Sequence, residues 1–190
     1  MSKMLFNYFE SGYRSLVTAI SIFACLCLLA LPAFAGIDDD KYDGNVFVLY
    51  AGNGSLVPAK ISLADSLKVN KPALIVFYVD DSSDCKKYST TISQLQGYYG
   101  KATSFIPVTV DSLALDKKYA NTEAGYYYNG TVPQTVIVDK QGKVRLNESG
   151  QISFEKVDDT LREVFDLLPR EKSIELKRRS FNEFNSELAK

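Results

Sequence analysis

Residues 73–86 read ALIVFYVDDSSDCK, an apolar run that passes directly into a polar turn. The apolar part, from Ala73 to Val79, is continuous and of strand length, which predicts a central β-strand covered on both faces. The turn from Asp80 to Ser83 supplies side chains that cap a helix N-terminus. Apolar residues then recur at steps of three and four, which predicts one amphipathic helix. These residues are Cys85, Tyr88, Ile92, Leu95 and Tyr99.

The elements around this run alternate between strand and helix, and then end in a hairpin and a last helix. Upstream we expect a strand from Asn45 to Tyr50 and a short helix from Ser62 to Val69. Downstream we expect a strand at Phe105–Val110, a weak helix at Leu113–Ala120, a hairpin of Thr131–Asp139 with Lys143–Leu146, and a helix from Phe154 to Leu168. This order predicts an α/β fold with a mixed sheet and helices on both faces.

Composition excludes several classes of function. The 190 residues contain no His, which removes Ser-His-Asp and Cys-His catalysis and every His-containing metal site. Lys+Arg number 22 and Asp+Glu 23, so the formal charge of -1 offers no field to hold a nucleic acid. The sequence suggests no metal, no cofactor and no small-molecule substrate.

The N-terminal 35 residues form a membrane-directed segment. Ser15 to Ala35 contains no charged residue and is long enough to cross a bilayer. Pro32 followed by Ala33-Phe34-Ala35 is typical of a signal-peptide cleavage site before Gly36, but an uncleaved anchor fits equally well. In both cases the chain from residue 36 onward is translocated across the membrane, so we expect an extracytoplasmic protein. The acidic residues 36–43 are predicted to be a linker.

Two motifs in the predicted domain resemble the thioredoxin family. Ile75 to Lys86 resembles the family's strand and the redox turn W-C-x-x-C-K that opens a helix, with Ser82 at the position of the first Cys and Cys85 at the second. Gly130 to Thr135, followed by strand, turn and strand, resembles the family's cis-proline loop and terminal hairpin. The likeness covers about residues 44–168 and implies a thioredoxin-like fold with a cis bond at Val132-Pro133.

The turn lacks the sulfur that dithiol chemistry needs. In a dithiol oxidoreductase one thiolate attacks and a second Cys resolves the mixed disulfide. Cys25 and Cys27 lie in the leader, so residues 36–190 contain Cys85 alone and can form no internal disulfide. A Ser82 hydroxyl without a base cannot attack a disulfide usefully, so the sequence excludes ordinary thioredoxin activity.

Cys85 itself has two interpretations. It lies on the apolar face of its helix and can be a buried small side chain, since free Cys is among the most buried residue types. Alternatively it is a monothiol redox residue that needs an external thiol. The helix N-terminus, Lys86, Lys87 and Ser82 would favour its thiolate, whereas Asp80, Asp81 and Asp84 oppose it.

The resemblance also implies a peptide groove, which can persist without redox chemistry. In the family the residue before the cis proline, here Val132, offers its backbone to an extended peptide beside the turn. We therefore assign Val132, Pro133 and Tyr78 to peptide binding. Tyr126, Tyr127 and Tyr128 are further candidates, although three consecutive Tyr can also be a loop that packs onto the domain.

The C-terminal segment, residues 169–190, is predicted to be an amphipathic helix. Its apolar side is too aromatic to leave in water, and it comprises Ile174, Phe181, Phe184 and Leu188. Its own domain, an anionic lipid face and a groove on a membrane complex are the possible partners. Glutamates dilute its basic face, so we favour a partner protein.

The degenerate turn, the Gly130–Thr135 loop and the tail motif Arg178 to Phe184 together resemble the cyanobacterial thylakoid family named as photosystem I accumulation factors. The resemblance implies a non-enzymatic factor that assists assembly or accumulation of photosystem I from the thylakoid lumen, with photosystem I or its assembly intermediates as partner. The alternative functions are a monothiol redox protein acting through Cys85 and a simple membrane tether. The alternative locations are the periplasm and the outside of the cell, after secretion.

Overall fold

The computed structural model describes residues 16–25, 36–114 and 116–173, and the chain divides into two compact units, Met1–Ala35 and Gly36–Lys190. In the first unit residues 16–25 form a helix whose side chains are all exposed. No helix within the described residues combines the length and the apolar content that a membrane span requires. Whether the leader is cleaved or retained stays a prediction.

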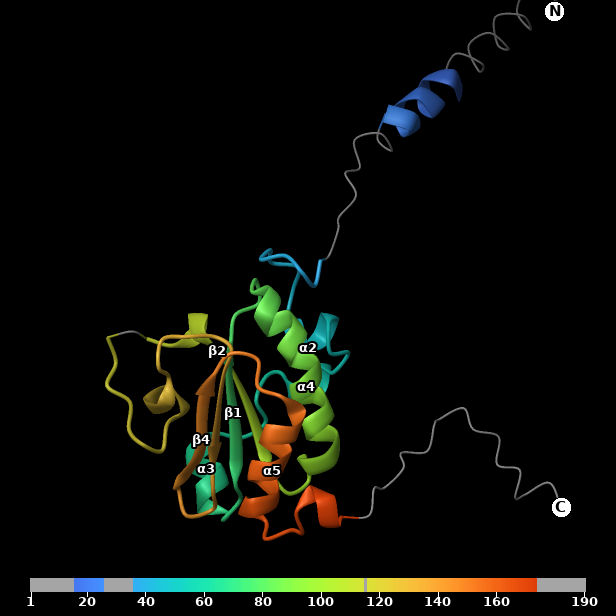
Figure 1. Ribbon diagram of the computed structural model, residues 1–190. Coiled ribbons are helices and arrows are strands. Elements are labelled where there is room, and N and C mark those ends of the chain that lie inside the picture. The colour runs from blue at the N-terminus through green and yellow to red at the C-terminus, as the bar shows by residue number, and fades with distance from the viewer. Residues whose placement is uncertain (1–15, 26–35, 115, 174–190) are drawn as a thin grey trace, which may run out of the picture. The chain divides into compact units, whose positions relative to one another are not determined.

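The second unit is built on a four-stranded mixed sheet with the strand order β2-β1-β3-β4 (Figure 1). Its strands are β1 (Ala73–Tyr78), β2 (Ser104–Thr109), β3 (Gln134–Val138) and β4 (Val144–Ser149). β1 runs parallel to β2 and antiparallel to β3, and β3 pairs with β4 in an antiparallel hairpin. Every residue of β1 is buried, as its continuous apolar run predicts.

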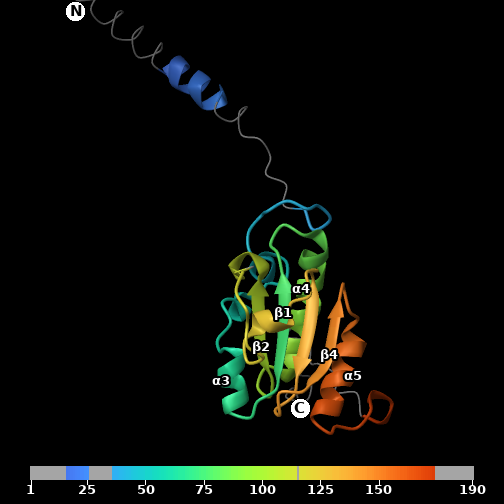
Figure 2. The same cartoon turned by 90° about the vertical axis from the view of Figure 1, so that its left-hand side faces the viewer.

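Helices cover both faces of the sheet (Figures 1 and 2). On one face lie α4 (Ser83–Tyr99), α5 (Phe154–Val164) and the short α2 (Val46–Leu49), and on the other lies α3 (Leu63–Lys68). Side chains of β1 alternate between the two cores. Leu74, Val76 and Tyr78 join the cluster under α4, whereas Ala73, Ile75 and Phe77 join the cluster under α3. The predicted α/β architecture is confirmed.

Short 3-10 turns complete the domain, at Gly54–Leu56, Val110–Ser112, Ala124–Tyr127 and Arg170–Lys172. The two long helices begin at serine caps, and the cap of α4 lies in the predicted turn from Asp80 to Ser83. Ser82 accepts from the amide of Cys85 at α4, and Ser153 accepts from the amide of Lys156 at α5.

The prediction of a strand from Asn45 to Tyr50 is wrong, because this segment forms α2. Its first amides are satisfied as at a helix N-terminus: Asn45 accepts from the amide of Phe47, and Asp80 accepts from the amide of Val46 at 2.9 Å. Val46 and Phe47 are both buried, a pattern that a strand with alternating faces does not give. The sheet therefore ends at β2.

The weak helix predicted from Leu113 to Ala120 is also absent from the described part of that range, which excludes residue 115. Side chains replace helical hydrogen bonds here. The Tyr119 hydroxyl accepts from the amide of Ala114, and the Glu123 carboxylate accepts from the amide of Ala120 and from Lys117. Local side-chain bonds of this kind compete with helix formation.

Candidate functional site

In the turn between β1 and α4, the first amides of the helix are hydrogen-bonded to side chains of the same chain. Ser82 holds an extended backbone at the N-cap, and its Oγ lies 3.3 Å from the amide nitrogen of Cys85. The neighbouring amide, of Ser83, donates to Oδ1 of Asp40 at 2.8 Å. This backbone bond, together with the Ser83 side chain, lowers the pKa of Asp40. The helix N-terminus is thus occupied by the chain's own serine and carboxylate.

Cys85 lies in the core rather than at the surface. Its side chain is 2% exposed and belongs to the cluster that includes Tyr88 and Ile92. Burial raises the pKa of the thiol, and hydrogen bonding to Val79 and Ser82 offsets this only partly. These surroundings favour the neutral thiol, which is neither the nucleophile nor the metal-binding form of Cys.

Lys86 does not support a thiolate, because its ammonium is engaged elsewhere. It is fully buried, and Nζ donates to Asp39 at 3.0 Å and to Asp43 at 2.8 Å. It also donates to the carbonyl oxygens of Gly36 and Asp39. Desolvation lowers the pKa of Lys86, but the hydrogen bonds with Asp43 and Asp39 outweigh it and raise the pKa overall. Lys87 pairs with Asp38 at 2.9 Å.

The acidic residues 36–43, predicted to be a linker, are therefore held against α4. We name this arrangement the Lys86 anchor, and it comprises Gly36, Asp39, Asp43, Tyr50 and Lys86. Tyr50 closes it, since its hydroxyl donates to Asp43 at 2.5 Å and its ring lies 5.3 Å from Nζ of Lys86. The sequence contains a signal for this arrangement in the run DDDKYD before a helix with two lysines, but nothing in the spacing indicates that one of the lysines is buried.

The loop before β3 has the predicted cis bond at Val132-Pro133. Pro133 is buried, and half-buried Val132 packs against both core clusters, including the one that contains Cys85. Thr131 fixes the loop from outside, where its hydroxyl bonds to Asn129 and to Ser149. Among the described residues, neither the N–H nor the C=O of Val132 has a hydrogen-bond partner. The loop is held by its neighbours, and the backbone of Val132 is left without a hydrogen bond among the described residues.

One hydrogen bond joins the helix of the turn to the strand of the loop. The hydroxyl of Tyr88 lies 2.8 Å from Oγ1 of Thr135, and both residues are buried. Burial raises the pKa of Tyr88 to about 12, so the hydroxyl keeps its proton at neutral pH. The turn and the loop are therefore packed and bonded parts of one core.

The tyrosines assigned to the groove divide between core and surface. Tyr78 is 5% exposed, accepts from the Asn45 amide group at 2.9 Å, and packs edge-to-face on Phe47, so it supports α2 rather than a peptide at the surface. Tyr127 is buried, and its hydroxyl donates to Asn121. Tyr128 packs on Phe77, and Tyr126 is exposed.

A separate groove of about 1210 Å³ runs along β2, the edge strand. It is lined by β2, by the start of α3, by residues 57–61 and by several residues between Ser112 and Gly125. Of the residues assigned to peptide binding, it includes Tyr78 but neither Val132 nor Pro133. A second cis bond, at Val57-Pro58, lies on its wall. Sequence reasoning did not find this bond, because an isolated X-Pro pair gives no local sign of its isomer.

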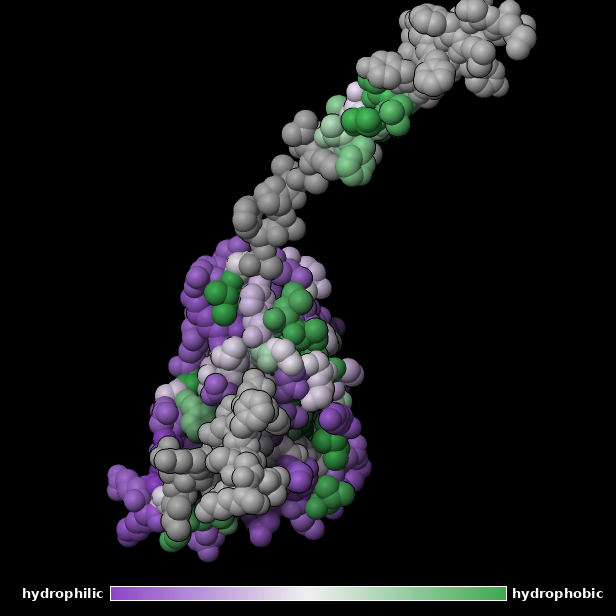
Figure 3. Space-filling model, turned by 90° about the vertical axis from the view of Figure 1, so that its right-hand side faces the viewer, coloured by the Kyte–Doolittle hydropathy of each residue, from purple (hydrophilic) through white to green (hydrophobic). Residues whose placement is uncertain are grey.

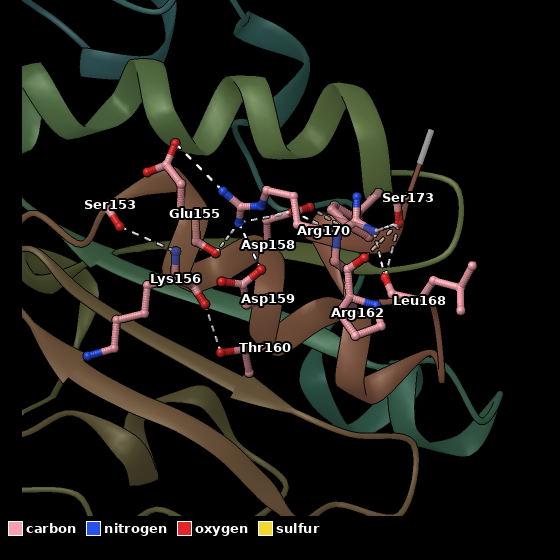
Figure 4. Close-up of polar contacts among 12 residues, drawn as sticks. Ser153, Glu155, Lys156, Asp158, Asp159, Thr160, Arg162, Leu168, Arg170 and Ser173 are labelled. Atoms are coloured by element: carbon pink, nitrogen blue, oxygen red, sulfur yellow. Dashed lines mark hydrogen bonds and ion pairs between the residues drawn. The ribbon is translucent and has the colours of Figure 1, made fainter. Parts of the chain in front are cut away.

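The predicted tail residues Ile174, Phe181, Phe184 and Leu188 lie outside the described residues. The structure does show what precedes them (Figure 4). Arg162 donates to the carbonyl oxygen of Leu168 and to Ser173, and Arg170 donates to Asp159 and to the carbonyl oxygen of Glu155. These bonds fold residues 168–173 back onto α5.

Known proteins provide three comparisons. The family model described as thioredoxin-like domain matches residues 60–165. The chain is 54% identical over 156 residues to the thylakoid membrane protein slr1796 of Synechocystis sp., covering 82% of this chain and 78% of that protein. Among solved structures, thioredoxin-2 of a malaria parasite is 16% identical with a TM-score of 0.41, covering 49% of this chain and 82% of that one. The germline-specific thioredoxin Deadhead of Drosophila melanogaster has the same identity and TM-score, with 52% and 88% covered.

Proposed function

The chain belongs to the thioredoxin-like domain family, and from that premise we propose that it is a non-enzymatic factor that assists assembly or accumulation of photosystem I at the lumenal side of the thylakoid membrane. The observation that carries the proposal is the closed turn. Ser82 stands at the first redox position, and the remaining thiol, on Cys85, is buried and kept protonated by its surroundings. A turn of this kind supports binding better than thiol exchange.

The loop supports a binding role directly. A backbone N–H and C=O without partners, on a segment fixed by its neighbours, can pair with an extended peptide at little ordering cost. Val132 offers both groups, in a loop held by Thr131 and Ser149. The thylakoid is proposed because the relative that shares 54% identity carries that location in its name, and the lumenal side follows from the predicted export of residues after 35.

A photo-crosslinking experiment tests the partner. A benzoylphenylalanine residue placed at Gln151 lies beside both the turn and the loop, because Gln151 donates to Asp84 and follows Gly150, whose amide donates to the carbonyl oxygen of Pro133. One placed at Lys140 lies past the other end of β3, and both positions are exposed. In native thylakoid membranes we expect crosslinks to a photosystem I subunit or assembly intermediate from position 151 and not from 140. Equal crosslinking from both positions, or crosslinks to unrelated proteins alone, would contradict the proposal.

The tail is tested separately by ending the chain at Ser173, which retains the contacts of Arg162 and Arg170. We expect a folded domain that no longer co-purifies with the membrane complex after mild solubilisation. If co-purification is unchanged, the tail does not bind the partner. If the domain unfolds, the tail belongs to the core.

The alternative, a monothiol redox protein, requires Cys85 to react in the folded state. With Cys25 and Cys27 replaced by Ser, the native chain should react with a thiol reagent at neutral pH only after unfolding. Rapid native reaction at Cys85 would favour the alternative over the proposed binding role.

A further inference from the structure

We propose that α2 and the segment before it form an apolar patch that binds the uncharged part of a lipid surface. The α2 patch consists of Ile37, Tyr42, Val48 and Leu49, which are 39%, 71%, 48% and 51% exposed. Single exposed apolar residues are ordinary on a protein surface, but four within 13 positions of one segment are not. This proposal does not depend on photosystem I as partner.

The two segments that carry the four residues, 36–43 and α2, lie against each other. The hydroxyl of Tyr50, at the C-terminus of α2, donates to Asp43, next to Tyr42, and lies 3.4 Å from the carbonyl oxygen of Gly36, next to Ile37. A Cβ added at Gly44 would come within 2.9 Å of Cδ1 of Leu49, so this turn also lies against α2. Figure 3 shows separate hydrophobic areas, divided by more hydrophilic surface, at the end of the domain where Figure 1 places α2 and the residues before it.

The lipid is chosen as occupant because of where the chain leads. The uncharged apolar run from Ser15 to Ala35 ends one peptide bond before Gly36. The carbonyl oxygen of Gly36 is held by the buried ammonium of Lys86 at 2.9 Å, so the folded domain begins at the first residue after that run. If the apolar run enters a membrane, the folded domain that carries the α2 patch follows it directly in the sequence.

The carboxylates around the patch are all engaged by other groups, so that Lys41 is the one charged side chain of residues 36–49 without an ion pair or hydrogen bond. Asp39 and Asp43 pair with Lys86, Asp38 pairs with Lys87, and Asp40 accepts from the amide of Ser83. Pairing lowers the cost of bringing these carboxylates close to a low-dielectric surface. Tyr42, the most exposed member, is of the type enriched at membrane interfaces, and a ring with a polar tip suits the headgroup layer.

The absence of Trp from the sequence gives a clean test. The full-length chain with Leu49→Trp is reconstituted into phosphatidylcholine vesicles, with and without bromine on the acyl chains, which quenches only tryptophans in contact with lipid. Val69→Trp is the matched control, because Val69 is a 64% exposed apolar residue after α3, which lies on the opposite face of the sheet from α2. Val48→Trp serves as a second reporter if Leu49→Trp does not fold.

We expect brominated lipid to remove most of the fluorescence of the α2 reporter and little of that of the Val69 reporter. The proposal is overturned if neither reporter is quenched, because the patch then does not contact lipid. It is also overturned if both are quenched to the same degree, because the domain then contacts lipid without preference for the patch. It is also overturned if the α2 reporter responds to protein density and not to bromine, because the patch would then be covered by a second copy. The proposal is likewise overturned if brominated lipid does not quench the α2 reporter and a co-reconstituted partner protein changes its fluorescence, because the patch would then be covered by protein.

Discussion

The turn that opens α4 and the loop that precedes β3 pack on one core, but they differ in whether their hydrogen-bonding groups are already paired. The turn has used its hydrogen-bonding groups internally: Ser82 caps the amide of Cys85, Asp40 accepts from Ser83, and the thiol is buried. The loop leaves the N–H and C=O of Val132 unpaired among the described residues while Thr131 holds its shape. The turn therefore offers no exposed thiol, whereas the loop keeps the backbone groups that the proposed peptide binding requires.

The two regions also differ in how they are held. The turn is held by residues 36–43, which lie outside the part of the chain that the family model matches. These residues contact the start of α4 through the Lys86 anchor. The loop depends on its own hairpin, through Ser149 on β4 and the bond between Gly150 and the carbonyl oxygen of Pro133. Changes in the anchor should therefore open the turn and leave the loop in place.

The largest effect is expected from Lys86→Met. Removal of the buried ammonium leaves Asp39 and Asp43 without their counter-ion, which is the costly way to break a buried pair. We expect a large loss of unfolding free energy, measured by chemical denaturation, that exceeds the loss caused by any single hydrogen-bond deletion in the core. Lys87→Met, which removes only the exposed pair with Asp38, is the control and should remain close to the wild type. Equal stability of the two variants would contradict the anchor.

The anchor also predicts a dependence on acid. The pKa of Asp43 is lowered first by hydrogen bonding to Lys86, and that of Asp40 by the amide of Ser83, both from an ordinary value of 3.8. Because the folded chain holds these protons more weakly than the unfolded chain, the stabilisation is complete above about pH 5 and is lost as the pH falls through 3.8 toward the folded values. Lys86→Met should reduce this acid sensitivity in a series of unfolding curves from pH 7 to pH 3.

A smaller effect is expected from Ser82→Cys in a chain with Cys25 and Cys27 replaced by Ser. The new thiol stands one turn from Cys85, at C-x-x-C spacing, so oxidation should form a disulfide detectable by mass spectrometry. Insulin reduction should stay weak, because Asp40 still occupies the amide of Ser83. Ser83→Cys is the control and should not form the bond. Failure of the 82–85 bond would mean that the turn is not placed as described.

The sequence predicted the parts of the molecule whose signals are local. The continuous run of β1, the capped stripe of α4 and the Val132-Pro133 loop each carry a pattern within about 20 residues, and all three were found. The α2 helix was missed because Val46 to Leu49 is apolar and β-branched in part, while the contact that sets its conformation, from Asp80, is distant in sequence. The burial of Lys86 was missed for the same reason, since its partners lie more than 40 positions away.

A still smaller effect, a modest loss of unfolding free energy, is expected from Tyr88→Phe, which removes the hydrogen bond between α4 and β3. The change leaves Oγ1 of buried Thr135 without its partner, at a cost of about 1 kcal/mol in unfolding free energy. Tyr98→Phe, at a position that is largely exposed on the same helix, is the control and should cost almost nothing. A cost at Tyr98 as large as that at Tyr88 would mean that the loss is a general property of the helix rather than of this bond.

The smallest effect is expected from Cys85→Ala, and its smallness is what distinguishes the two functions. If the loop alone binds the partner, the variant should keep wild-type crosslinking from position 151 and wild-type accumulation of photosystem I, with only the modest destabilisation that follows from a small core cavity. If Cys85 acts as a monothiol, Cys85→Ala and Cys85→Ser should both abolish function, although the chain still folds. Cys85→Ser adds a check on folding, because it keeps the volume and places a polar hydroxyl in an apolar site, so it should be the less stable of the two. Loss of function that follows stability, with Ser worse than Ala, would indicate packing, whereas equal and complete loss in both variants would assign chemistry to a thiol that the structure buries.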